Sequence, residues 1–212
     1  MRLVILALLP GIGAQIYFFG YGVLIQLLLA SVTALLAEAL ILILRRRPLG
    51  YHLADGSALL TAALIAVAIP PLAPWWLVVL GTAFAIIVGK QLYGGLGHNP
   101  FNPAMVAFAT CIVSFPALMS QWPSVGLHLP FADQLAIIFG QAPRVDALSG
   151  ATPLDAMKTA LKMGEGSVDV ASLLRNQDIY GNFAGSGWEW VALGYLVGGL
   201  WLWQQKLITW HL

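Results

Sequence analysis

Apolar residues gather in six long segments along the chain, separated by short polar stretches or by prolines and glycines. The segments cover residues 3–19, 23–44, 58–69, 75–93, 104–119 and 188–203. A helix that crosses a bilayer needs about 20 mostly apolar residues, and most of these segments approach that length. The pattern therefore predicts an all-α integral membrane protein, a polytopic helical bundle of about six transmembrane helices.

Residues 120–187 interrupt this pattern, because they hold most of the acidic residues and are punctuated by glycine and proline. We expect them to form one long loop between the fifth and sixth membrane helices. The chain is thereby divided into a transmembrane bundle at 1–119, the loop at 120–187, and a last transmembrane helix with the chain end at 188–212.

The composition excludes a soluble domain. Charged residues make up 9% of the chain and hydrophobic residues 59%, whereas soluble domains carry about 25% charged residues. A formal net charge of +1 is too small for a nucleic-acid-binding surface. The apolar composition instead indicates membrane lipid as a partner. The single cysteine, Cys111, excludes an intrachain disulfide and an all-cysteine iron–sulfur cluster within this chain, and we interpret it as a small buried residue.

The distribution of basic residues predicts the orientation in the membrane. Arg2, the arginine cluster at 45–47, Lys90 and Lys206 all fall on the same side when the spans are counted alternately. Short loops rich in Lys and Arg remain in the cytoplasm, so this side is expected to be cytoplasmic. The loop at 120–187 then faces the periplasm of a bacterial inner membrane.

Two polar features lie within or beside the apolar segments. The stretch from Gly94 to Pro103 cannot continue a helix, and it is either a plain cytoplasmic turn or a broken helix whose amides face a cavity. His98 within it is favoured as a hydrogen-bonded loop residue over a metal ligand. Glu38 either marks an ion path inside the bundle or reaches toward Arg45 or Arg46 at the membrane surface.

One motif in the long loop carries candidate chemistry, the run from Asp146 to Asp155 that contains Ser-Gly-Ala-Thr-Pro. Local rules predict a helix start here, with Thr152 as the N-cap, Pro153 as the first helical residue and Asp155 in the third position. A helix start also favours bound anions, because its free amides and its dipole point at them.

Several long stretches of the sequence resemble a known family. Ser149 to Thr159 is similar to the flavin-attachment region of the D-type component of Rnf electron-transport complexes and of the related B-type component of sodium-pumping NADH:quinone reductase. Lys90 to Met105 and Pro70 to Trp76 are similar to the same family. The resemblance extends over essentially the whole chain.

This resemblance implies a membrane subunit of an ion-translocating oxidoreductase complex, which is not catalytic alone. It implies covalent FMN, attached by a phosphodiester to Thr152 on the periplasmic side and installed by a separate flavin transferase. It also implies partner subunits of the Rnf A, B, C, E and G types, and no metal ligands in this chain. A second, non-covalent flavin and the choice between Na⁺ and H⁺ stay open. Because family members are longer at both ends, we expect this chain to be truncated.

The main alternative is a channel or secondary transporter that uses the stretch from Gly94 to Pro103 as a broken-helix site and carries no redox cofactor. A purely structural membrane scaffold is the third interpretation. Flavin absorbance that survives denaturation would separate the first interpretation from the other two.

Overall fold

The computed structural model describes residues 1–95, 97–127, 129–142, 150, 154, 157–159, 162, 180–181 and 185–209. Over these residues the fold is all-α, and their β-type pairing is one isolated bridge between Tyr180 and Gly185. The helices are α1 (Arg2–Phe19), α2 (Gly22–Leu44), α3 (Leu49–Leu53), α4 (Ser57–Ala68), α5 (Trp75–Phe84), the π-helix η1 (Ala85–Gln91), α6 (Pro103–Ser114), α7 (Pro116–Met119), α8 (Phe131–Ile138) and α11 (Trp188–Gln204).

Each of the six predicted apolar segments is helical, which confirms the predicted fold class. By length and composition, α1 and α2 are able to cross a membrane, while α4, α5 with η1, and α6 are shorter apolar helices. The fifth segment is divided into α6 and α7 because Phe115, which precedes Pro116, leaves the helical region at φ −135° and ψ 55°. Helices α3 and α8 lie where loops were predicted. The proposed division of the chain into three parts stays a prediction.

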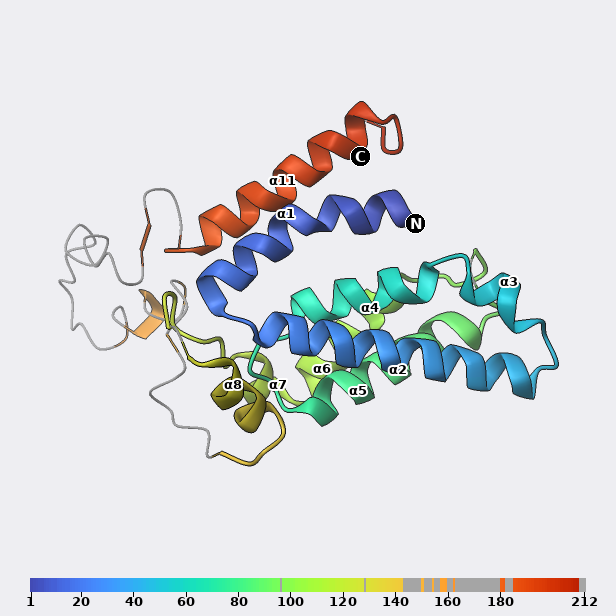
Figure 1. Cartoon of the computed structure of the whole chain (residues 1–212), viewed down its shortest axis with the longest axis horizontal. Helices are drawn as coiled ribbons and strands as arrows, with labels where there is room; N and C mark the ends of the chain where they lie inside the picture. The colour runs from blue at the N-terminus through green and yellow to red at the C-terminus, as the bar shows by residue number, and fades with distance from the viewer. Residues whose placement is uncertain are drawn as a thin grey trace.

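The helices form two groups that lie side by side. In Figure 1, α1 packs along α11, and in the neighbouring group α2 packs against α4 and α5, which in turn pack against α6. Successive long helices run in alternating directions, so α3 lies at one end of the molecule and α7 and α8 lie at the other. The core of the second group contains many small side chains, including the fully buried Ala30, Ala34 and Ala62. Small residues permit the close backbone approach by which membrane helices associate.

The crossing of α1 and α11 depends on glycines. A Cβ atom at Gly198 would collide with the carbonyl oxygen of Ala7, and one at Gly194 would lie 2.8 Å from the carbonyl oxygen of Pro10. Gly194 and Gly198 are four residues apart and therefore lie on one face of α11, as in other small-residue membrane contacts. Cys111 in α6 lies against Gly81 in the same manner and is 3% exposed, which confirms its interpretation as a small buried residue.

Two buried glutamines support the proline-rich turn between α4 and α5. Gln26 Nε2 donates to the carbonyl oxygens of Pro71 at 3.2 Å and Ala73 at 2.7 Å. Gln15 Nε2 donates to the carbonyl oxygen of Val67 at 3.1 Å. Prolines supply no amide hydrogen, so carbonyls near them need donors from elsewhere when no water is present. The glutamines therefore make a sharp, dry turn possible.

A third glutamine attaches α8 to the start of α2. Gln134 Oε1 accepts a hydrogen bond from the Gly22 amide at 2.6 Å, and Gln134 Nε2 donates to the Leu129 carbonyl at 2.7 Å. The Gly22 amide is one of the helix-start donors that lack an intrahelical partner. This contact fixes part of the loop at 120–187 against the membrane helices.

Candidate functional site

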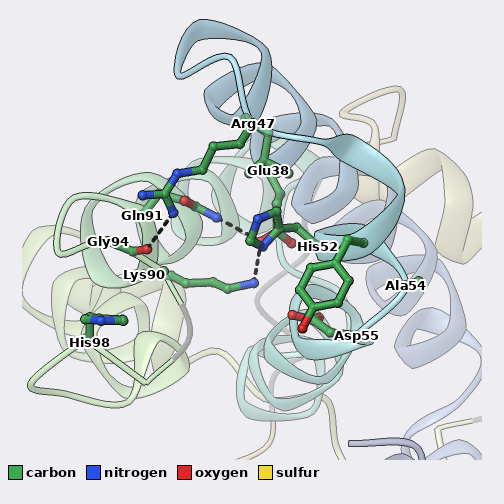
Figure 2. Close-up of a pocket in the computed structure, with 12 residues that line it drawn as sticks. Glu38, Arg47, His52, Ala54, Asp55, Lys90, Gln91, Gly94 and His98 are labelled. Atoms are coloured by element: carbon green, nitrogen blue, oxygen red, sulfur yellow. Dashed lines mark hydrogen bonds and ion pairs between the residues drawn. The ribbon is translucent and has the colours of Figure 1, made fainter.

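Among the described residues, the polar site with the most buried charge lies where α2, α4 and η1 meet, at the same end of the bundle as α3 (Figure 2). The last turns of the α5–η1 helix are bonded in the π pattern, for example from the Leu92 amide to the Ile87 carbonyl at 2.9 Å. Consecutive side chains of a regular helix project about 100° apart, and the wider π turn changes that spacing. Both Lys90 and Gln91 are consequently buried and reach the same acceptor on α2.

That acceptor is Glu38, whose carboxylate is 1% exposed. Its Oε1 accepts hydrogen bonds from Lys90 Nζ at 2.5 Å and from Gln91 Nε2 at 2.8 Å. Lys90 Nζ also donates to Ser57 Oγ at 2.6 Å, and the Ser57 hydroxyl donates to Asp55 Oδ1 at 2.5 Å. We call these five residues the Glu38 network. It joins three helices through one buried ion pair.

The Glu38 network leaves one acceptor open. Glu38 Oε2 is buried and has no hydrogen-bond partner among the described residues. Buried polar atoms are nearly always paired, and unpaired ones in membrane helices commonly lie on a functional path. The carboxylate therefore keeps one oxygen that can accept a hydrogen bond or contact a cation in addition to the Lys90 ammonium.

A cavity of about 530 Å³ opens beside the network. Its wall contains two acidic side chains, Glu38 and Asp55, and four basic or imidazole side chains, Arg47, His52, Lys90 and His98. Figure 2 shows Arg47 reaching across the opening, where its Nη1 donates to the Gly94 carbonyl at 3.2 Å. In the part of the chain that the structure describes, no group of three or more His, Cys, Asp and Glu side chains is arranged to hold a metal ion.

The stretch from Gly94 to Pro103 contributes to this cavity and also connects two helices. Gly94, Gly95 and His98 lie in the cavity wall, whereas Phe101 is 68% exposed. Asn102 caps the start of α6 at the end of the stretch, because its Oδ1 accepts from the Ala104 amide at 2.9 Å. Gly94, Gly95 and His98 thus line the cavity, but their amides donate to nearby backbone carbonyls, and the choice between a plain turn and a broken-helix site stays a prediction.

The prediction that Glu38 reaches toward Arg45 or Arg46 is wrong. Both arginines are exposed, and Glu38 is paired with Lys90 instead. Lys90 was expected at the membrane surface, and its burial was not predicted. The sequence did contain a signal for this pair: one lysine and one glutamate lie in separate apolar segments. Each charge alone is costly in a membrane, so the two are expected to pair.

The motif from Asp146 to Asp155 is described at Gly150 and Leu154, and Thr152 lies outside the described residues. The Gly150 amide donates to the Trp122 carbonyl at 2.9 Å, and a Cβ atom at Gly150 would lie 2.9 Å from Ser124 Oγ. Further along, Leu154, residues 157–159 and Lys162 have helical backbone, as expected for a helix after Pro153. Gly150 thus attaches the motif to the segment that precedes α8.

Comparison with known proteins gives a consistent picture. A model of the NQR2, RnfD, RnfE family matches residues 1–212. Two proteins from Escherichia coli, of strain SE11 and strain K12 / DH10B, are named as the D component of an ion-translocating oxidoreductase complex, and each is 49% identical to this chain over 227 residues. Each match covers 100% of this chain and 64% of the relative, so the chain spans slightly less than two thirds of those proteins.

Proposed function

Because the chain belongs to the NQR2, RnfD, RnfE family, we propose that it is a membrane subunit of a complex that couples electron transfer to ion translocation. The observation that carries this proposal is the similarity over the whole chain to relatives named as subunits of an ion-translocating oxidoreductase complex. The all-α fold with its long apolar helices agrees with a subunit that resides in the membrane. Other Rnf-type subunits, of the A, B, C, E and G types, are its proposed partners.

Electrons pass, in this proposal, through FMN bound covalently to Thr152. The support is the Ser-Gly-Ala-Thr-Pro motif and the attachment of Gly150 to the end of the bundle opposite the Glu38 network. The threonine hydroxyl would hold the flavin through a phosphodiester made by a separate transferase, and the flavin supplies the redox chemistry. The chain itself anchors the cofactor and limits where it can move.

Arg47 of the arginine cluster lies in the cavity wall beside the Glu38 network, and Gly150 of the motif is bonded to Trp122, between α7 and α8 at the other end of the bundle. By the positive-inside rule the network end faces the cytoplasm and the flavin end faces the periplasm of a bacterial inner membrane. We place Glu38 on the ion path of this chain, because its buried carboxylate retains an open oxygen beside a polar cavity. The same cavity would suit a channel or transporter that carries no flavin.

The presence of covalently bound flavin distinguishes the electron carrier from the channel or transporter. The chain is expressed in membranes together with a flavin transferase, purified, and examined on a denaturing gel for flavin fluorescence, followed by mass spectrometry of the labelled peptide. We expect a fluorescent band and FMN mass on the peptide that contains Thr152. An unlabelled wild-type chain, with a partner flavoprotein labelled in the same cells, would overturn the electron-carrier proposal and favour the transporter.

A further inference from the structure

Three aromatic rings form a compact cluster at the end of the bundle where α1 ends and α11 begins. The ring centroids of Phe19 and Trp188 are 4.7 Å apart, those of Trp122 and Trp188 are 4.7 Å apart, and those of Phe19 and Trp122 are 6.0 Å apart. All three distances lie within the range for favourable aromatic contacts. We call this group the Trp122–Trp188 cluster.

The cluster is held rigidly in place. The Gly126 amide donates to the Phe18 carbonyl at 3.1 Å, and a Cβ atom at Gly187 would lie 2.7 Å from Val125 Cγ1. The backbones on either side of the two indoles are therefore fixed against the end of α1. Phe19 is 3% exposed, whereas both indoles are only partly buried. The indoles thus pack against a buried phenyl ring, and each keeps part of its surface exposed.

The flavin motif is attached to this cluster through the backbone. The Gly150 amide donates to the carbonyl oxygen of Trp122 at 2.9 Å. Two Cα–Cα steps of about 3.8 Å join Gly150 to Thr152, so their Cα atoms can be at most about 7.6 Å apart. A group tethered to the Thr152 hydroxyl through a ribityl phosphate chain is consequently within reach of the indoles.

We propose that the isoalloxazine ring of the flavin attached through Thr152 packs against the exposed parts of Trp122 and Trp188, stacked on one indole and edge to face with the other, because the two indole planes are inclined at 70°. This inference rests on the proposed function, and it adds the surface that holds the ring. A planar, extended aromatic ring is the type of ligand that offset or edge-to-face contacts with indole favour. The fixed backbone around the cluster means that the surface exists before the flavin arrives, which lowers the entropy lost on docking.

The competing explanation is that the indoles serve packing and the membrane interface alone, where tryptophan is enriched. The two explanations differ in a photophysical property. An indole in contact with a flavin quenches its fluorescence by electron donation to the excited ring, and a phenyl ring does so far less. Quenching therefore reports contact with the indoles in the folded protein, independently of electron-transfer activity.

The test uses the flavinylated chain with Trp122→Phe, Trp188→Phe and both substitutions, since phenylalanine retains an apolar ring in each position. Flavin content is measured by absorbance after denaturation, and the fluorescence lifetime is measured on the folded protein. We expect a strongly quenched wild type, partial recovery in each single variant, and a several-fold longer lifetime in the double variant. Iodide should also quench the flavin more effectively in the double variant, because one face of the ring is uncovered.

Trp203→Phe is the matched control. It lies on the same helix, is 52% exposed, and follows Trp188 by 15 residues, which is about 22 Å along α11. Its lifetime should equal that of the wild type. Covalent flavin with an unchanged lifetime in the double variant would refute the stacking and leave the proposed function intact. A reduced flavin content with an unchanged lifetime would assign the indoles to packing and would also refute the stacking. A wild-type chain without covalent flavin would refute both proposals.

Discussion

Replacing Lys90 by methionine would leave the Glu38 carboxylate buried without its counter-charge. The ammonium makes two contacts in the structure, to Glu38 Oε1 at 2.5 Å and to Ser57 Oγ at 2.6 Å, and methionine can make neither. The side chains of Lys90 and Glu38 are 3% and 1% exposed, so bulk water screens the remaining carboxylate charge only weakly. Methionine has a similar length and is apolar, which limits the effect of the substitution to the charge and its hydrogen bonds.

The expected magnitude follows from these contacts. Removing one partner of a buried ion pair costs roughly 3–5 kcal/mol. Glu38 would retain the hydrogen bond from Gln91 Nε2 at 2.8 Å, so we expect the lower end of that range, about 3 kcal/mol. For a chain of this size each kcal/mol corresponds to a change of roughly 2–4 °C in the unfolding temperature, which gives a decrease of about 6–12 °C.

The assay is the thermal unfolding temperature of the detergent-purified chain, followed by tryptophan fluorescence. Glu38→Gln should decrease it similarly, because the Lys90 ammonium would then be buried beside a neutral amide. The double variant Glu38→Gln/Lys90→Met buries no charge and should recover most of the loss, with a coupling free energy of at least about 2 kcal/mol. Arg47→Met, at an exposed cation in the same cavity wall, is the control and should change stability by less than about 0.5 kcal/mol. Additive losses in the double variant would contradict the interpretation of a charge pair.

Three further sets of substitutions test the flavin site, the orientation and the helix cap. Thr152→Ala should remove covalent flavin from a denaturing gel with membrane insertion intact, and Thr152→Ser should retain the cap but lose much of the flavin if the transferase requires threonine. In a Cys111→Ser background, Gln141→Cys should react with an impermeant thiol reagent in intact spheroplasts and Gly50→Cys should not; the reverse pattern would invert the predicted topology. Asn102→Ala should destabilise the start of α6 by about 1 kcal/mol, measured as a lower unfolding temperature, whereas Asn102→Asp should not; equal effects would exclude a capping role.

The positions of the membrane helices were predictable because their signals are local. A helix was expected at 3–19 and at 23–44, and α1 and α2 occupy Arg2–Phe19 and Gly22–Leu44. The breaks between apolar segments are marked by glycine, arginine or proline in the sequence itself. Length and apolar character then decide the type of element without knowledge of its neighbours.

Helix α8 could not be predicted in the same way. It has eight residues within a polar stretch, and its buried anchor Gln134 contacts Gly22, which is 112 residues earlier in the chain. A glutamine in a loop is ordinarily solvated, so its identity alone gives no indication of burial. Only the fold, which places the turn between α1 and α2 beside this helix, brings Gln134 to the Gly22 amide. The π-helix at Ala85–Gln91 was equally hidden, because an apolar run fits both helix types.

The Glu38–Lys90 pair lies between these two cases. The residues are 52 positions apart, so local rules could not join them, and proximity to Arg45 and Arg46 suggested a different partner for the acid. The decisive consideration is energetic. A lysine that ends an apolar segment can extend its ammonium to the membrane surface only if its helix presents that face outward. Here the π turn directs Lys90 inward, where an unpaired ammonium would be prohibitively costly, so the fold requires an acid on a neighbouring helix. The type of helix at Lys90 therefore determines the partner of Glu38, and the pair could not be predicted as long as a regular α-helix was assumed at that position.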